Sequence, residues 1–310
     1  MYSYPVGEWV RANSYLAEVK GDMTSEAKLM GGKICIVTGA SSGVGKATAL
    51  GLAKMGATVV MVCRSRARGE AALAEIKQES GTDSIYLLCA DLSSQASIRQ
   101  LCSGFQARHP SLHVLINNAA IIPKERTLTE DNLEMQFAVN HLAYFLVTDL
   151  LLDMLKASAP ARVVNVASMV HKYATINFDD LQSESSYDRT RVYGMTKLAN
   201  VLFTYELARR LKNTQVTANC LHPGVVATNI FADYMGIPRP LRAAGRLMGG
   251  SPEKGARTSL YLATSPEVEG VSGRYFVHEK AARSSTVSHD AAIAGRLWQV
   301  SRELTQPANG

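Results

Sequence analysis

The chain has 310 residues, of which 46% are hydrophobic and 19% are charged. This balance is typical of a globular protein with a large core, and it excludes a disordered chain. The formal net charge of +6 is mild and the basic residues form no block, so we expect no nucleic-acid partner, although the charge is compatible with an anionic cofactor.

The five cysteines stand apart, and no two of them form a C-x-x-C pair. We therefore expect buried free thiols in a reducing compartment and no metal site. No stretch reaches the roughly 18 apolar residues that a membrane span requires. The N-terminus lacks the charged and apolar regions of a signal peptide. These features predict a cytoplasmic protein without an integral membrane segment.

Residues 1–32 predict an N-terminal extension, because they are polar, carry scattered aromatic side chains and end at Gly31-Gly32. A short helix over 6–19 would pack on the body of the protein or lie on a membrane surface, and packing is the simpler expectation. Residues 33–304 predict one domain, and 305–310 a short tail.

From residue 33 the sequence alternates apolar strand-like runs with amphipathic segments of helix length. The predicted strands cover 34–38, 58–63, 84–90, 114–117, 162–166 and 215–221. The predicted helices cover 44–55, 68–79, 95–108, 131–157 and 190–212. Strands that alternate with helical crossovers predict an α/β fold, namely a single-domain, Rossmann-type, doubly wound parallel sheet with helices on both faces.

Residues suited to ligand binding stand at or just past the ends of the predicted strands. They are Thr38, Cys63, Asp91, Asn117, Ser168 and Pro223. In doubly wound sheets, ligands bind beyond the carboxyl ends of the strands, where the winding reverses. We therefore expect these positions to share one site.

A glycine-rich turn joins the first strand to the first helix. Its spacing, G-x-x-x-G-x-G, permits a tight turn and lets backbone amides approach a pyrophosphate at the helix N-terminus. The candidate cofactor-binding residues in this turn are Gly39, Ser41, Ser42, Gly43, Val44 and Gly45. A nucleotide triphosphatase loop does not fit, because Ala47 stands where a Ser or Thr would hold magnesium.

The second strand is followed by Arg64, with Arg66 and Arg68 close behind, and Cys63 stands where an acid would bind the ribose of NAD. An arginine here accommodates the 2′-phosphate of NADP, so the pattern favours NADP(H) over NAD(H). The alternative is a solvated basic turn. After the third strand, Asp91-Leu92 would contact the adenine, unless Asp91 only caps a turn.

Tyr193 and Lys197 are four residues apart in a helical segment, so both side chains project from one face. An ammonium group one turn away favours the phenolate and lowers the pKa of the phenol. The pair would then act as a general acid and base. Taken alone, it is also compatible with a chance arrangement on a helix.

Residues 229–250 break the alternation with interspersed Pro and Gly, which predicts a mobile lid over the substrate. Its apolar residues favour a bulky hydrophobic substrate of lipid, terpenoid or aromatic type; they are Ile230, Phe231, Tyr234, Met235, Ile237, Leu241, Leu247 and Met248. Ser251 and Pro252 then predict the N-cap and first residue of a helix. A strand over 275–277 and a helix over 289–304 close the domain.

Together these residues resemble the short-chain dehydrogenase/reductase family over about residues 33–304. Its motifs occur in the family's order, as the T-G-x-x-x-G-x-G loop, Asn117-Asn118-Ala119, Asn140, Asn165-Val166-Ala167-Ser168, Tyr193-x-x-x-Lys197 and Pro223-Gly224. Segments 197–203, 222–226 and 296–298 are similar, more narrowly, to retinol-dehydrogenase-type members.

The resemblance implies that Tyr193 protonates the substrate carbonyl as hydride arrives from the nicotinamide, and that Lys197 lowers the pKa of Tyr193 and binds the nicotinamide ribose. It implies that Ser168 donates a hydrogen bond to the substrate oxygen and that Asn140 holds a proton-relaying water. It places along the cofactor Asn118, Ala119, Pro223, Gly224, Val226 and Thr228.

The sequence departs from the family pattern in three places. Ala120 stands where the family usually has a glycine, and segment 171–191 is longer than in many relatives, so we expect it to shape the substrate entrance. Many retinol-dehydrogenase-type members begin with a hydrophobic anchor, which segment 1–32 does not resemble. His171 and His222 are interpreted as polar loop residues, because Tyr193 already fills the acid–base role.

The sequence therefore predicts an NADP(H)-dependent oxidoreductase that interconverts a hydrophobic ketone or aldehyde and its alcohol. The helices over 131–157 and 190–212 match the family's usual subunit contacts, which favours a homodimer or homotetramer. Two other functions stay open. One is reduction of a C=C bond, as in the light-dependent pigment reductases of the same superfamily, and the other is a non-catalytic NADP(H)-binding regulator.

Overall fold

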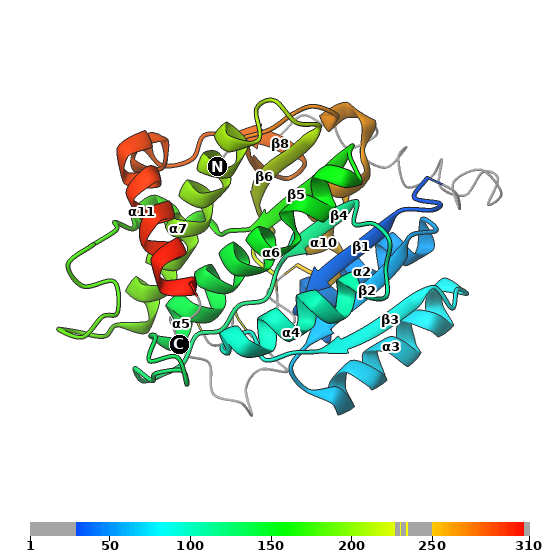
Figure 1. The fold of residues 1–310 in the computed structure, drawn as a ribbon, viewed down its shortest axis with the longest axis horizontal. Coiled ribbons are helices and arrows are strands. Elements are labelled where there is room, and N and C mark those ends of the chain that lie inside the picture. The colour runs from blue at the N-terminus through cyan, green and yellow to red at the C-terminus, as the bar shows by residue number, and fades with distance from the viewer. Residues whose placement is uncertain (1–28, 227–229, 231–233, 235–249, 307–310) are drawn as a thin grey trace, which may run out of the picture.

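The computed structural model describes residues 29–226, 230, 234 and 250–306, and its centre is one eight-stranded sheet (Figure 1). The strands are β1 (Ile34–Thr38), β2 (Thr58–Cys63), β3 (Ile85–Cys89), β4 (Val114–Asn117), β5 (Ala161–Val166), β6 (Val216–His222), β7 (Tyr275–Val277) and β8 (Lys280–Ala282). Their order is β3-β2-β1-β4-β5-β6-β7-β8. All neighbours pair in parallel except β7 and β8. The predicted doubly wound fold is confirmed, and the antiparallel edge strand β8 is an addition.

Helices follow the strands as predicted. They are α2 (Gly43–Lys54), α3 (Arg66–Ser80), α4 (Gln95–Gln106), α5 (Met135–Phe137), α6 (Ala143–Ala157), α7 (Arg189–Arg210), α10 (Pro252–Thr264) and α11 (Ala291–Thr305). The helix predicted over 131–157 begins later, at Met135, and contains a π-helical turn over Ala138–Leu142. Ser251 caps α10 by accepting a hydrogen bond from the Lys254 amide, which confirms the predicted N-cap.

The winding reverses between β1 and β4. From β1 the chain adds β2 and β3 on one side, and then returns to place β4 on the other side of β1. The register aligns Val37 with Ile116, so Thr38 and Asn117 end adjacent strands. This reversal is the place where doubly wound sheets bind their ligands.

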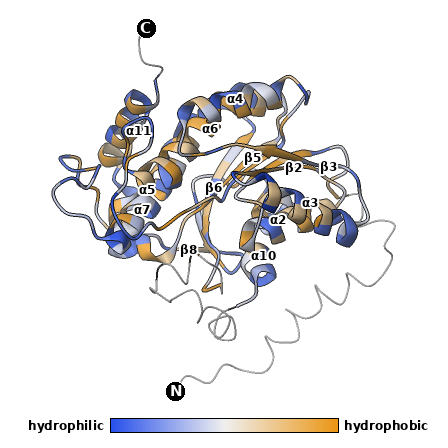
Figure 2. Cartoon of the chain, turned by 90° about the horizontal axis from the view of Figure 1, so that it is seen from below, coloured by the Kyte–Doolittle hydropathy of each residue, from blue (hydrophilic) through white to orange (hydrophobic). Residues whose placement is uncertain are grey.

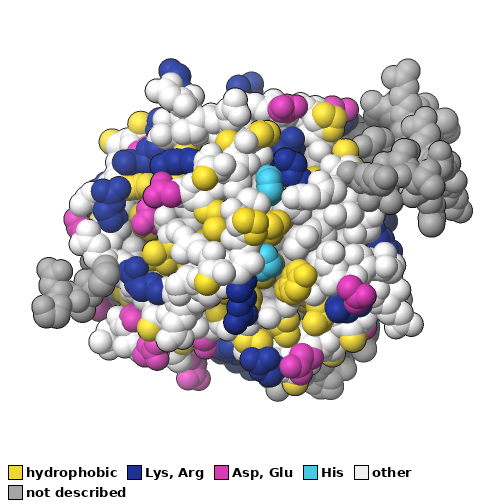
Figure 3. Space-filling model, turned by 45° about the vertical axis from the view of Figure 1, so that its right-hand side comes forward, with side chains coloured by type: hydrophobic (Ala, Val, Ile, Leu, Met, Phe, Trp, Pro, Cys, Tyr) yellow, Lys and Arg dark blue, Asp and Glu magenta, His cyan; other side chains and the backbone are white. Residues whose placement is uncertain are grey.

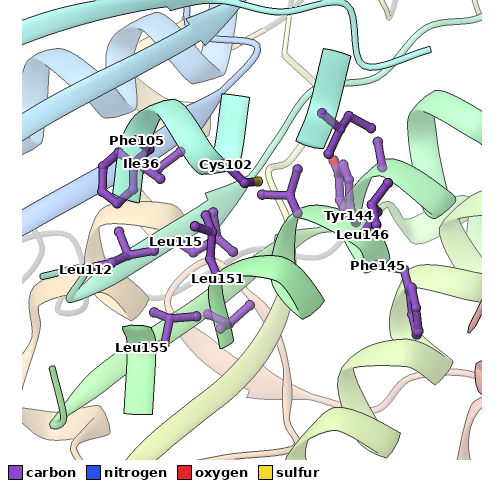
Figure 4. Packing of buried hydrophobic residues seen from close by; sticks show 14 of the residues in the cluster. Ile36, Cys102, Phe105, Leu112, Leu115, Tyr144, Phe145, Leu146, Leu151 and Leu155 are labelled. Carbon is purple, nitrogen blue, oxygen red and sulfur yellow. The ribbon is translucent and has the colours of Figure 1, made fainter. Parts of the chain in front are cut away.

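The side chains of each strand alternate between two hydrophobic cores, because successive residues of a strand point to opposite faces. On β1, Ile36 packs in the core beneath α4 and α6, whereas Val37 packs in the core with α2 and α10. Figure 2 shows α4 and α6 on one side of the sheet and α2, α3 and α10 on the other. In Figure 4, Leu115 of β4 lies beside Leu151 of α6.

The helix α7 is buried over most of its length by other elements of the chain. All residues from 192 to 207 are buried, and α11 packs against its outer side. There Trp298 stacks on Phe203 at 5.7 Å between ring centres and meets Phe145 of α6 at 5.0 Å. Within one chain, α4 packs on α6 and α11 packs on α7, and the expected homodimer or homotetramer stays a prediction.

One described segment, Met135–Ala157, is long and apolar enough to cross a membrane, with a hydropathy of 1.3 over its most apolar 18 residues. In the fold, 72% of that window is buried, and the segment covers the sheet. We therefore assign it to the core. This segment was not predicted as a possible span, because Asn140, His141 and Asp149 interrupt its apolar run.

All five cysteines are free, and four are buried as expected, whereas Cys89 at the end of the edge strand β3 is exposed. On the face shown in Figure 3, Lys and Arg side chains are spread out, with acidic and apolar side chains between them. That face therefore carries no continuous basic surface.

Candidate active site

The glycine loop between β1 and α2 leaves the helix N-terminus open. Gly39 and Gly43 have φ angles of +68° and +56°, a region that glycine adopts at low cost. A Cβ on Gly39 would lie 2.9 Å from the Cα of Ala119, and one on Gly45 would lie under 3.0 Å from the Gly39 oxygen. The N-cap residue Ser42 makes no side-chain capping bond within the described residues. The amides at this end of α2 therefore suit an anionic ligand such as a pyrophosphate.

Asn118 fixes this loop to the neighbouring strand. Its Nδ2 donates to the Thr38 carbonyl at 2.8 Å, and its backbone amide donates to Thr38 Oγ1 at 2.8 Å. The amide of Ala119 donates to the same hydroxyl at 3.1 Å. The Asn118 side chain therefore joins the ends of β1 and β4 beneath the predicted cofactor.

A cavity of about 1580 Å³ lies beyond the carboxyl ends of the strands. It is lined by the predicted residues Gly39, Ser41, Ser42, Gly43, Val44, Gly45, Arg64, Asp91, Leu92, Asn118, Ala119, Ser168, Tyr193, Lys197, Pro223, Gly224 and Val226. Thr228 lies outside the described residues, as does most of the predicted lid over 229–250, of which Ile230 and Tyr234 line the cavity. Among the predicted site residues that the structure describes, Asn140 does not line this cavity.

At one end of the cavity the three arginines after β2 separate into two groups. Arg64 and Arg68 line the cavity. Arg66, which begins α3, instead lies 3.6 Å from Glu70 on the helix surface. The sequence alone does not separate Arg66 from Arg68, because the rotation of α3 decides which of the two side chains faces the cavity.

Asp91 holds a turn and lines the cavity, and its predicted contact with the adenine stays a prediction. Its Oδ1 accepts hydrogen bonds from the amide and hydroxyl of Ser93 at 2.9 and 2.6 Å, which fixes the turn after β3. It also lines the cavity next to Leu92, where an adenine would lie.

Three predicted catalytic side chains line the other end of the same cavity. Tyr193 and Lys197 lie on one face of α7, with the Lys197 Nζ 5.5 Å from the centre of the Tyr193 ring, as the helical spacing predicted. Lys197 Nζ also donates to the Val166 carbonyl at 2.9 Å, at the end of β5. Ser168 follows this strand, and its Oγ accepts a hydrogen bond from the Val170 amide at 3.5 Å.

Burial, and not the neighbouring ammonium, dominates the electrostatics of this pair. The Tyr193 side chain is buried, and burial raises the pKa of its phenol above the ordinary value, with the Tyr234 phenol adding to the effect. Burial also lowers the pKa of Lys197 to about 7. The net shift of the Tyr193 pKa is therefore upward, opposite to the predicted one, because desolvation penalises the charged forms of both groups.

Asn140 lies in the π-helical turn and is fully buried. Its Nδ2 donates to the Ile121 carbonyl at 3.0 Å, and its Oδ1 accepts from the Ile121 amide at 2.8 Å. Its own carbonyl accepts from Asn200 Nδ2 at 2.9 Å. These bonds hold the cavity wall at Ile121 to α7, whereas the predicted water-holding role stays a prediction.

The two histidines interpreted as polar loop residues are buried, so that interpretation is wrong. His171 has an exposed fraction of 0% and His222 one of 8%. Burial lowers the pKa of His222 to about 4, and its Nδ1 has no hydrogen-bond partner among the described residues. His222 lines the cavity, which the sequence analysis did not predict.

An apolar wall of the same cavity was not predicted from the sequence. It consists of Ile121, Ile122, Pro123, Met135, Val139, Met169 and Val170. These residues come from three segments that are distant in sequence, so no spacing pattern connects them. With Ile230 and Tyr234 they leave an apolar space beside the catalytic side chains.

Comparison with known proteins agrees with this arrangement. The family model of the short chain dehydrogenases matches residues 33–235. Human retinol dehydrogenase 14 is 47% identical over 293 residues, which cover 89% of this chain and 87% of that protein. An uncharacterized protein from Mycobacterium paratuberculosis has a similar structure, with a TM-score of 0.74, 32% identity, and coverage of 91% of this chain and 96% of that chain.

A further structure is that of Pseudomonas aeruginosa RhlG in an active-site complex with NADP. Its TM-score is 0.64, its identity is 25%, and the match covers 81% of this chain and 96% of that chain. The matched family region contains the glycine loop, Ser168, Tyr193 and Lys197. The chain therefore belongs to the short chain dehydrogenase family and is an oxidoreductase with a Rossmann-type fold.

Proposed function

We propose that the protein interconverts a bulky hydrophobic ketone or aldehyde with its alcohol, using NADP(H). One observation carries this proposal: Ser168, Tyr193 and Lys197 line the same cavity as the glycine loop, next to an apolar wall. The chain's likeness to a retinol dehydrogenase supports a hydrophobic alcohol or its carbonyl as the substrate.

The cavity fits a nicotinamide dinucleotide. The glycines of the loop keep the N-terminus of α2 open for the pyrophosphate, and Arg64 and Arg68 would bind a 2′-phosphate at the far end. When bound, the dinucleotide supplies or accepts the hydride. The NADP complex of the RhlG relative supports the choice of NADP(H).

The protein's own groups would handle the proton and the developing charge. Tyr193 is buried and its pKa is raised, so its hydroxyl is protonated at neutral pH and can give its proton to the carbonyl oxygen. Ser168 would donate a second hydrogen bond to that oxygen, whose negative charge grows in the transition state. Lys197, held by the Val166 carbonyl, would favour the phenolate once the proton has left.

A substrate panel tests this function. NADPH oxidation would be followed with long-chain and isoprenoid aldehydes, aromatic ketones and small polar ketones. We expect turnover with the hydrophobic carbonyls and little with the small polar ones. Products reduced at a C=C bond would instead favour the pigment-type reductase. NADPH binding without turnover of any compound would favour the non-catalytic regulator.

The cofactor preference can be tested on the arginines. We expect Arg64→Ala and Arg68→Ala each to weaken NADPH binding about 10-fold or more, since a hydrogen bond to a charged group contributes about 1.5–3 kcal/mol. NADH binding should change little. Arg66→Ala is the matched control, because Arg66 faces Glu70 and not the cavity. An unchanged ratio of NADPH to NADH affinity in both cavity variants would exclude a 2′-phosphate site here.

A further inference from the structure

Ser168 would act through its hydroxyl, yet that hydroxyl is weakly held. Its bond from the Val170 amide is 3.5 Å long, so the position of Oγ depends on the backbone at residue 168. This backbone turns from β5 into the short 3₁₀ helix Met169–Tyr173, of which Ser168 is the N-cap. The group that fixes this turn therefore determines where the hydroxyl lies.

The imidazole of His171 binds the turn from inside, in addition to the bond at 3.2 Å from the His171 backbone amide to the Ser168 carbonyl. Its Nδ1 lies 2.6 Å from the Ser168 carbonyl oxygen, and its Nε2 lies 3.1 Å from the backbone nitrogen of Ser285. A carbonyl only accepts and an amide only donates, so Nδ1 carries the proton and Nε2 accepts. The ring is fully buried and packs edge-on against Tyr275 at 4.8 Å.

The far partner of His171 leads back to the helix that carries Tyr193. Ser285 is preceded by Ser284, whose hydroxyl lies 2.8 Å from the hydroxyl of Tyr205 on α7. The Ser288 hydroxyl donates to the Ser285 carbonyl at 2.6 Å and closes this turn. The imidazole thus joins the backbone of Ser168 to a segment that is anchored on α7.

We propose that His171 is the positioning residue that sets the distance between the Ser168 hydroxyl and Tyr193. His171 is not among the residues that line the cavity, so it would act on the substrate only through Ser168. Its contribution is geometric, because a displacement of about 1 Å in a reacting group can lower a rate about 100-fold. This inference rests on the proposed function, in which Ser168 and Tyr193 bind the same substrate oxygen.

Two matched substitutions separate the two bonds of the ring. The Nδ2 of an asparagine occupies nearly the place of Nδ1, so His171→Asn keeps the bond to Ser168 and loses the one to Ser285. The amide of a glutamine extends to the place of Nε2, so His171→Gln keeps the Ser285 contact and loses the Ser168 one. We expect His171→Gln to lower kcat about 10- to 100-fold. His171→Asn should retain most of kcat, and NADPH binding, measured by its fluorescence, should be within twofold of wild type in both.

A double-mutant cycle shows whether the effect passes through Ser168. Ser168→Ala should lower kcat by about 10²–10³, as for loss of one oxyanion donor. In that background His171→Gln should lower kcat less than twofold further. Equal kcat values for the two histidine variants, or losses that multiply in the double variant, would overturn the inference. Full activity of Ser168→Ala would instead contradict the proposed function itself.

Discussion

Substitutions in the glycine loop allow a quantitative test of the proposed pyrophosphate site at the N-terminus of α2. In Gly45→Ala, the new Cβ would lie under 3.0 Å from both the Gly39 oxygen and Asn118 Nδ2. Neither neighbour can move freely, because one is backbone and the other is bonded to the Thr38 carbonyl at 2.8 Å. Overpacking of this kind costs about 1–3 kcal/mol. Loss of the Asn118 bond leaves a part-buried amide unpaired, which costs about 1–3 kcal/mol more.

Two other glycines serve as controls for the loss of stability expected of Gly45→Ala. Gly51→Ala places its Cβ 2.5 Å from Leu260 Cδ1, the end of a flexible side chain, so the loss should be smaller. Gly104→Ala, in α4, meets nothing within 4 Å and should stabilise the protein by up to about 1 kcal/mol through helix propensity.

Urea unfolding and NADPH titration would measure the series. The free energy of unfolding should fall in the order Gly104→Ala, wild type, Gly51→Ala, Gly45→Ala, and Gly45→Ala should lose NADPH binding. A Gly45→Ala protein as stable as wild type, with unchanged affinity, would refute the reasoning about the loop.

Two further predictions concern the enclosing helix and the buried histidines. Trp298→Ala removes the ring that packs on Phe145 and Phe203, and it should lower the free energy of unfolding by about 3–5 kcal/mol. Tyr173→Ala is the control, because Tyr173 is 88% exposed; it should change the free energy of unfolding by less than about 0.5 kcal/mol. Equal midpoints in urea would contradict the packing of α11 on α6 and α7. Acidification should destabilise the protein between about pH 6.5 and 4. Burial lowers the pKa of His141 and of His222 to about 4. In that pH range the unfolded chain therefore binds protons that the folded chain does not bind, and the free energy of unfolding falls. The urea concentration at the unfolding midpoint should fall as the pH falls, and it should fall less in His222→Gln. A midpoint that rises on acidification would contradict the lowered pKa values of the two buried histidines.

The sequence predicted the parts of the fold that depend on local pattern. Strands such as β2 are continuous apolar runs, which is what burial on both faces requires. The spacing of Tyr193 and Lys197 fixed their common face, because an α-helix repeats every 3.6 residues. The glycine spacing likewise located the turn that leaves the end of α2 open.

Features that depend on tertiary contacts could not be predicted in this way. The burial that raises the pKa of Tyr193 comes from elements far away in the sequence, so spacing to Lys197 gave the wrong sign. His171 was likewise interpreted as a polar loop residue from its sequence context, whereas in the fold it is fully buried. The separation of Arg68 from Arg66 depends on how α3 is rotated against the sheet.

The central claim is that Tyr193 transfers the proton that accompanies hydride transfer. It is tested most directly by comparing Tyr193→Phe with wild type, measuring kcat with the best hydrophobic carbonyl at saturating NADPH and measuring NADPH affinity in parallel. Tyr193→Phe should lower kcat by about 10²–10⁴, the usual contribution of a general acid, with NADPH affinity within twofold of wild type. A Tyr193→Phe enzyme that turns over at the wild-type rate would contradict the account.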